Sequence, residues 1–203
     1  MNVDDFIASQ FPVLPVPADG AVKAAGQGVR YHAARNGLWR EINLPWMRSL
    51  MPAATNDGIK VPYGLPTASV ELALPVPDKS LWRDFVQQAK AAMPNECAAI
   101  IAWNTATQQW RFAPRRALKA NPSFIEYEEP SLDENEIKVV DLHSHALHPA
   151  YFSSTDDTDD RGSIKLSVVF GNIDGEVTME ARLMLIDHAV KVAIDGTTWS
   201  AQL

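Results

Sequence analysis

The sequence has a single cysteine, no long apolar run and an acidic N-terminus, and each of these excludes a class of protein. One thiol has no partner within the chain, so Cys97 excludes an internal disulfide, and its apolar surroundings indicate a buried structural residue rather than a nucleophile. No run of about 18 apolar residues is available for a membrane span. The opening MNVDDFIASQ is acidic where a signal peptide would be basic. We therefore expect a cytoplasmic protein with no membrane partner.

Basic residues are also in the minority. Eighteen lysines and arginines stand against 25 aspartates and glutamates, which gives a net charge of −7. Such a balance argues against a nucleic-acid backbone or an anionic membrane as the main partner. The 203 residues are 46% hydrophobic, enough for a sizeable core. We expect two unequal domains, covering residues 1–77 and 78–203.

The first domain is expected to be small and rich in β-structure. Nine of the 14 prolines fall in residues 1–77, and proline interrupts long helices. Two alternating segments flank Asn36 and Gly37, a favoured hairpin signal. Trp39 and Trp46 are expected to pack its core.

The second domain reads as a helix followed by strands. Residues 78–93 place apolar side chains at helical spacing, with Pro94 as the stop signal. Strands are expected at residues 96–104 and 137–145, with an exposed loop at residues 126–136 between them. The C-terminal part, with turns at Asp174-Gly175 and Asp195-Gly196, predicts a β-meander.

Potential metal ligands gather between Asp141 and Gly162, in DLHSHALHPAYFSSTDDTDDRG. His143 and His145 are two residues apart on a predicted strand, so both imidazoles project from one face. A loop leaving the strand can then return the carboxylate of Asp156 to the same ion. Two imidazoles and one carboxylate, with a fourth position for water, form the ligand set of a catalytic zinc site. Taken singly, histidine pairs and aspartate-rich loops are more often surface features than ligands.

The complete spacing is more specific. Seven residues separate His145 from Ser153, and two separate Ser153 from Asp156. This pattern resembles the signature of the JAMM (MPN+) metallopeptidases, which also have a glutamate at the head of an upstream strand; Glu96 occupies that place in ECAAIIAWN. The resemblance implies that His143, His145 and Asp156 bind Zn²⁺, that Glu96 is the general base, and that Ser153 donates to the oxyanion.

The resemblance extends to the prokaryotic JAB proteins of PRTRC systems, through NGLWR, residues 94–103 and PAYFSSTDDTDDRG. One departure is Ala146, because the family pattern has proline directly after the second histidine. The implied fold is α/β, a cytidine-deaminase-like JAB/MPN mixed sheet flanked by helices. The implied function is hydrolysis of an amide bond at the C-terminal tail of a ubiquitin-like protein or its conjugates, with other PRTRC-system proteins as possible partners. The alternatives are a catalytically silent MPN-type scaffold and a regulatory metal-binding component.

Other polar residues near the motif have simpler interpretations. Asp141 either orients one histidine or is solvated at the strand end. Arg115, Arg116 and Lys119 form a basic patch that we interpret as a solvated rim. The run DTDDRG lacks the ligands of an EF-hand loop, so its aspartates support the site or cap a short helix. The isolated histidines, His32 and His188, are interpreted as structural.

Overall fold

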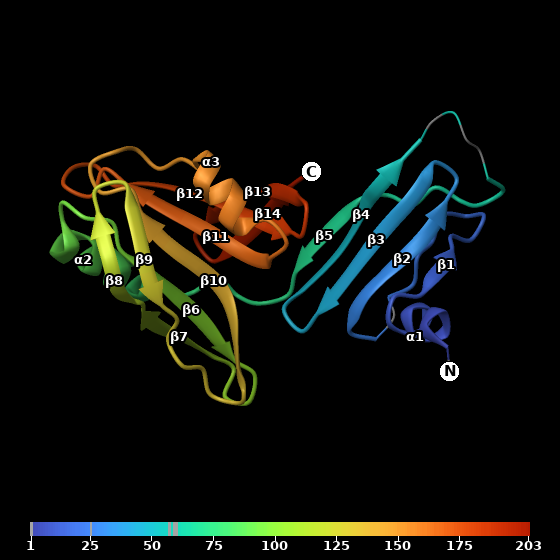
Figure 1. The fold of residues 1–203 in the computed structure, drawn as a ribbon, viewed down its shortest axis with the longest axis horizontal. Helices are drawn as coiled ribbons and strands as arrows, with labels where there is room; N and C mark the ends of the chain where they lie inside the picture. Colours follow the sequence, from blue (N-terminus) through green and yellow to red (C-terminus); the bar gives the residue numbers. More distant parts are fainter. Residues whose placement is uncertain (1, 25, 57, 59–60) are drawn as a thin grey trace. The chain divides into compact units, whose positions relative to one another are not determined.

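The computed structural model describes residues 2–24, 26–56, 58 and 61–203 (Figure 1). The chain divides into two compact units, one ending at Leu74 and the other spanning Pro75–Gln202. Among the described residues, no helix is long and apolar enough to cross a membrane. Each unit is built around its own sheet.

The N-terminal unit is a five-stranded sheet whose strands follow one another in sequence order (Figure 1). Its elements are α1 (Val3–Gln10), β1 (Val13–Pro15), β2 (Gly28–Ala34), β3 (Gly37–Leu44), β4 (Met47–Thr55) and β5 (Ser69–Leu72). The predicted hairpin is confirmed, because β2 and β3 pair antiparallel. Its turn lies one residue earlier than the predicted Asn36-Gly37: Ala34 is opposite Gly37, so the two turn residues are Arg35 and Asn36. The φ of Gly37 is 132°, which only glycine adopts readily.

Two features hold this small sheet together. Trp39 and Trp46 are buried as expected, together with Ile42, Met47 and Leu50. Beside them, His32 Nε2 lies 3.0 Å from Glu41 Oε2, and Arg48 Nε donates to Glu41 Oε1 at 3.1 Å. The buried carboxylate therefore keeps charged or polar partners on both oxygens, as buried charge requires. His32 is structural here, as its sequence context indicated.

The second unit contains a seven-stranded mixed sheet in the order β14-β13-β12-β11-β10-β6-β7. Its strands are β6 (Ala98–Asn104), β7 (Gln109–Pro114), β10 (Glu136–Ser144), β11 (Ile164–Gly171), β12 (Thr178–Leu185), β13 (His188–Asp195) and β14 (Thr198–Gln202). Only β10 and β11 run parallel, and the last four strands form the expected meander. The expected mixed α/β architecture, preceded by a β-rich unit, is confirmed.

Helices lie over both faces of this sheet (Figure 1). The predicted first helix is α2 (Lys79–Ala92), and its buried Phe85 packs 5.3 Å from the ring of Phe170 on β11. Phe170 pairs with Ser144, so α2 covers the face that carries Leu142 and Ser144. His143, and the residues two positions away from it along β10, project from the opposite face of the sheet. The short helix α3 (Ser154–Asp160) lies over that face.

The segment between β7 and β10 differs from the expected irregular loop. It forms a separate two-stranded sheet of β8 (Arg116–Asn121) and β9 (Phe124–Glu128). Its side chains are largely exposed, so the apolar alternation that identifies a buried strand is weak. The loop prediction was therefore wrong over the first residues of 126–136, where β9 continues to Glu128.

Candidate metal centre

The two motif histidines are carried by the end of β10. His143 is the next-to-last residue of β10 and pairs with Val169 of β11, while His145 directly follows the strand. The backbone N–H of His145 donates to Phe170 O at 2.8 Å, so the extended direction continues past the strand end. Both imidazoles consequently project from the same face, as the two-residue spacing predicted.

Helix α3 brings the carboxylate to the histidines. Ser153 is its N-cap, and a capping box joins it to Asp156: the Ser153 hydroxyl and backbone N–H both donate to Asp156 Oδ2 at 2.7 Å. In return, the backbone N–H of Asp156 donates to Ser153 Oγ at 3.2 Å. The serine and the aspartate of the motif therefore form one local structure, in which the cap fixes the carboxylate.

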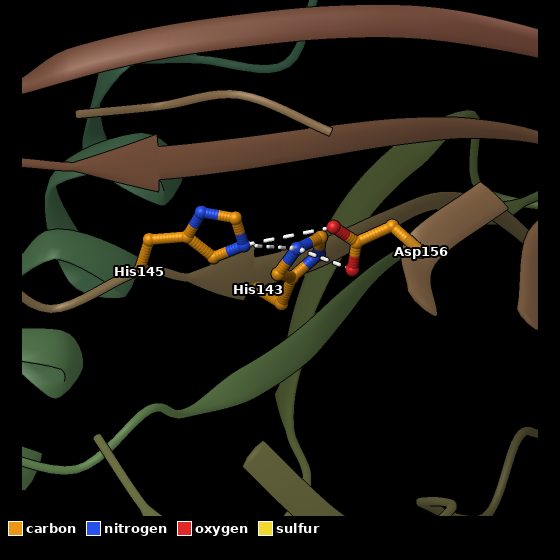
Figure 2. Close-up of side chains that lie close together, drawn as sticks. All are labelled: His143, His145 and Asp156. Atoms are coloured by element: carbon orange, nitrogen blue, oxygen red, sulfur yellow. Dashed lines mark hydrogen bonds and ion pairs between the residues drawn. The ribbon is translucent and has the colours of Figure 1, made fainter. Parts of the chain in front are cut away.

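Three ligand atoms converge at this point (Figure 2). His143 Nε2 lies 3.2 Å from His145 Nε2 and 3.1 Å from Asp156 Oδ1, and His145 Nε2 lies 3.6 Å from Asp156 Oδ2. Zinc bonds of about 2.0–2.1 Å to nitrogen or oxygen make the edge of a tetrahedron about 3.3 Å long. The two imidazole nitrogens are separated by about this edge length, whereas the two histidines approach different oxygens of Asp156. One ligand atom from each of the three residues lies within 4.8 Å of the others, which is close enough for a shared ion.

The electrostatics of the cluster also suit a cation. Burial alone would raise the pKa of Asp156, but hydrogen bonds from His143, His145 and Ser153 outweigh burial and hold that pKa well below its ordinary value. The carboxylate is therefore ionised over the whole physiological range. The buried Nδ1 of His145 has no hydrogen-bond partner among the described residues. His145 therefore lacks the second hydrogen bond that a metal-ligating histidine usually makes through its other ring nitrogen.

Glu96 lies just before β6, whose first residue is Ala98, rather than within the strand as expected. Its neighbour Cys97 is fixed to β10 by two bonds: Ser144 N donates to Cys97 O, and Cys97 N donates to Ser144 Oγ, each at 3.0 Å. Ser144 lies between the two histidines, so this pairing sets Glu96 beside them. Burial raises the pKa of Glu96 to about 7, with the His145 charge opposing and the Asp156 charge adding to the effect.

The turn after the histidines explains the departure from the family pattern. Ala146 has a φ of 43°, whereas the proline ring fixes φ near −65°. Proline at this position is therefore incompatible with the observed turn. The turn is held from the other side, because Ile173 N donates to Ala146 O and Asn172 N donates to His148 O.

A cavity of about 270 Å³ opens on the cluster. Its lining includes Glu96, the two histidines, Ser153 and Asp156, so every residue of the motif faces one space. One wall is the tip of the β8–β9 hairpin, and the backbone N–H of Glu96 donates to Asn121 O in that hairpin at 3.0 Å. The lining residues that sequence reasoning missed include His148, Tyr151, Lys165 and Ser167. The first two lie within the motif stretch, whereas nothing local singles out the others.

Asp141 takes neither of the roles considered for it. Its buried carboxylate accepts a close charged hydrogen bond from Arg115 Nη1 and one from Lys165 Nζ at 2.8 Å. Arg115, expected on a solvated rim, has a side chain only 1% exposed and also donates to Glu129 Oε1 at 2.7 Å. The interpretation of Arg115 as rim was wrong because its two carboxylate partners come from other parts of the chain. Arg116, in contrast, is exposed and pairs with Glu128.

Some of the aspartates after the motif form ion pairs with the sheet, and others are exposed to solvent. Asp157 and Asp160 of α3 both contact Arg182 of β12, while Asp159 is exposed and lines the cavity. His188 starts β13 and contacts the adjacent Asp187, with Nδ1 3.0 Å from Oδ1, and it does not line the cavity. Of the two predicted uses, supporting the site and capping a short helix, the contacts of Asp157 and Asp160 match the first.

Comparison with known proteins places both units in families. A family described as a domain of unknown function, DUF2016, matches residues 1–73. Among solved structures, the solution structure of protein DSY2949 from Desulfitobacterium hafniense is 17% identical, with a TM-score of 0.44 over 56% of this chain and 86% of that chain. No curated protein matches the chain. The family described as prokaryotic homologs of the JAB domain matches residues 78–185, more than half of the chain, which therefore belongs to this family.

Proposed function

We propose that the second unit is a zinc-dependent peptidase of the JAMM type that hydrolyses an amide bond. The observation that carries the proposal is the convergence of one ligand atom each from His143, His145 and Asp156 within 4.8 Å, beside a cavity that Glu96 also lines. Zinc in that position would supply a Lewis acid, which lowers the pKa of a bound water and polarises a carbonyl. Three protein ligands leave a coordination position for water or substrate.

Glu96 is the proposed general base. A carboxylate whose pKa lies near the working pH can both accept a proton and release it. Burial raises the pKa of Glu96 to about 7, which is in that range. In this role its carboxylate takes a proton from the attacking water and passes it to the leaving amine, so that one residue serves both steps.

Ser153 has two proposed roles. Its hydroxyl donates to Asp156 Oδ2 and thereby orients the carboxylate. A serine hydroxyl has one hydrogen to donate. To stabilise the oxyanion, Ser153 must therefore exchange Asp156 for the substrate oxygen, while its backbone N–H keeps the bond to Asp156. Removing an oxyanion donor of this kind costs about two to three orders of magnitude in turnover.

The proposed substrate is the C-terminal tail of a ubiquitin-like protein, alone or conjugated, and the proposed setting is a PRTRC system. Membership of the JAB family and the motif pattern support this assignment by analogy. One wall of the cavity is the hairpin tip with Pro122, Phe124 and Ile125. These side chains offer apolar contact beside the metal ligands.

The test is a cleavage assay with ubiquitin-like proteins extended at the C-terminal tail by a peptide amide, analysed by mass spectrometry. Zinc-loaded protein should release the extension, and Glu96→Gln should bind zinc but leave the substrate intact. Failure of zinc-loaded wild type to cleave any member of the panel would contradict the peptidase proposal and favour the silent scaffold or the regulatory metal-binding component. Cleavage that persists in Glu96→Gln would contradict the role of the base.

A further inference from the structure

Helix α3 delivers Asp156 to the histidines, yet it has no apolar side chain with which to pack. Its sequence, STDDTDD, consists of hydroxyl and carboxylate residues, and the only buried member is Asp160. A surface helix ordinarily docks through an apolar stripe. Four carboxylates in seven residues also repel one another. The attachment of α3 to the sheet must therefore depend on positive charge.

Arg182 on β12 supplies most of that charge. Its Nη1 donates to Asp157 Oδ1 at 2.5 Å, and its Nη2 and Nε donate to Asp160 Oδ2 at 2.7 and 3.2 Å. The guanidinium thus spans the middle and the end of the helix with a planar fork, which a lysine cannot do. The Arg182 and Asp160 side chains are each 9% exposed, so their pair is weakly screened by salt, whereas the Asp157 side chain is 58% exposed and its pair with Arg182 is open to solvent.

Lys165 completes the anchor at the helix end. Its Nζ lies 2.6 Å from Asp160 Oδ1 and 2.8 Å from Asp141 Oδ2. Both oxygens of Asp160 are therefore paired, one with each cation. Removing Arg182 leaves Asp160 paired with Lys165, but it leaves the Asp157 side chain without an ion-pair partner among the described residues. The middle of α3, next to Asp156, then loses its attachment to β12.

Arg182 also contacts Phe152, an aromatic residue that packs against His143. Its guanidinium carbon lies 3.8 Å above the ring of Phe152, within the range of a cation–π contact. Phe152 in turn packs edge-on against the ring of His143, at 6.5 Å between centroids. Arg182 therefore contacts two supports of the ligand set, the helix that carries Asp156 and the aromatic ring that packs against His143.

We propose that Arg182 is a positioning residue for the metal centre, which holds α3 and Phe152 so that Asp156 and His143 keep the spacing a tetrahedral ion requires. This inference rests on the proposed zinc site and adds to it a residue outside the motif. Removing a supporting residue of this kind typically lowers metal affinity by about 10- to 100-fold. The competing interpretation is that Arg182 contributes to folding stability alone.

The experiment measures zinc dissociation constants by competition with a chromogenic chelator, together with thermal unfolding of the metal-free protein. Arg182→Gln should bind zinc about 10- to 100-fold more weakly than wild type. Arg182→Lys should recover part of the loss because it keeps the charge but not the fork. Lys191→Gln is the matched control, since Lys191 lies opposite Arg182 on β13, is exposed, and should bind zinc as wild type does.

A second pair of variants decides the question if Arg182→Gln does not fold. Asp157→Asn and Asp159→Asn remove the same charge from exposed positions of α3, but only Asp157 contacts Arg182. Asp159 lines the cavity, so a purely electrostatic effect on the ion would be at least as large for Asp159→Asn. The proposal predicts the greater loss of zinc affinity for Asp157→Asn.

The outcomes separate this inference from the proposed function. Absence of zinc binding in the wild type would overturn both. If the wild type binds zinc and Arg182→Gln binds it with equal affinity, the positioning role alone is overturned. If Arg182→Gln is unfolded, equal losses of zinc affinity in Asp157→Asn and Asp159→Asn overturn it instead.

Discussion

Substitution of Asp141 by asparagine tests the buried ion pairs beside the metal centre. The Asp141 side chain is 9% exposed and is paired with Arg115 and Lys165. Burial alone would raise the pKa of Asp141, but the two cations outweigh burial and lower it from 3.8 to about 2. In Asp141→Asn, Arg115 keeps Glu129 and Lys165 keeps Asp160, so neither buried cation is left unpaired.

The size of the effect follows from linkage between ionisation and folding. The folded-state pKa lies below the unfolded value, so the ionised carboxylate contributes stability above pH 3.8 that is lost as the pH falls through 2. The shift corresponds to about 2 kcal/mol at pH 7, because one pKa unit is worth about 1.4 kcal/mol. At pH 3, where the unfolded carboxyl is already largely protonated, about 1 kcal/mol remains.

Urea unfolding of the wild type and Asp141→Asn at pH 7 and pH 3 measures both values. The free energy of unfolding should fall by about 2 kcal/mol at pH 7 and by about half as much at pH 3. Asp195→Asn, at an exposed position, is the control and should change little. An equal deficit at both pH values would refute the ionisation argument, and no deficit at pH 7 would show that the pairs only offset their desolvation.

Three further substitutions probe the base, the cap and the core. Glu96→Gln should lower the cleavage rate by about 10²- to 10⁴-fold without loss of zinc; unchanged turnover in a single-turnover assay would exclude the base. Ser153→Ala removes the N-cap of α3 and should lower the free energy of unfolding by about 1 kcal/mol in urea, so equal stability would show that the cap is dispensable. Leu142→Ala empties a fully buried site on β10 and should cost about 2–5 kcal/mol by the same assay, a smaller loss meaning that the core collapses around it.

The parts of the structure that are encoded locally could be predicted from the sequence. The apolar spacing of residues 78–93 identified α2, because a single stripe must face the sheet. The two-residue spacing of His143 and His145 placed both imidazoles on one face, because side chains alternate along a strand. The meander followed from the same alternation and from the turn dipeptides, whereas the mixed sheet was implied only by the family resemblance.

The parts that depend on distant partners could not be predicted in this way. Arg115 is buried because Asp141 on β10 and Glu129, which follows β9, both pair with it, and no local pattern reports such a pairing. The β8–β9 hairpin has mostly exposed side chains, so its pattern is that of a loop. Likewise, α3 lacks an apolar face and is fixed by Arg182, 25 residues from Asp157 in sequence.

Metal analysis of the purified protein tests the central claim most directly, namely that His143, His145 and Asp156 bind a zinc ion. Mass spectrometry should find about one zinc per chain in the wild type and none in the His143→Ala/His145→Ala double variant. Retention of zinc by the double variant would place the ion elsewhere. A wild-type protein that binds no metal, even after zinc is supplied, would contradict the account.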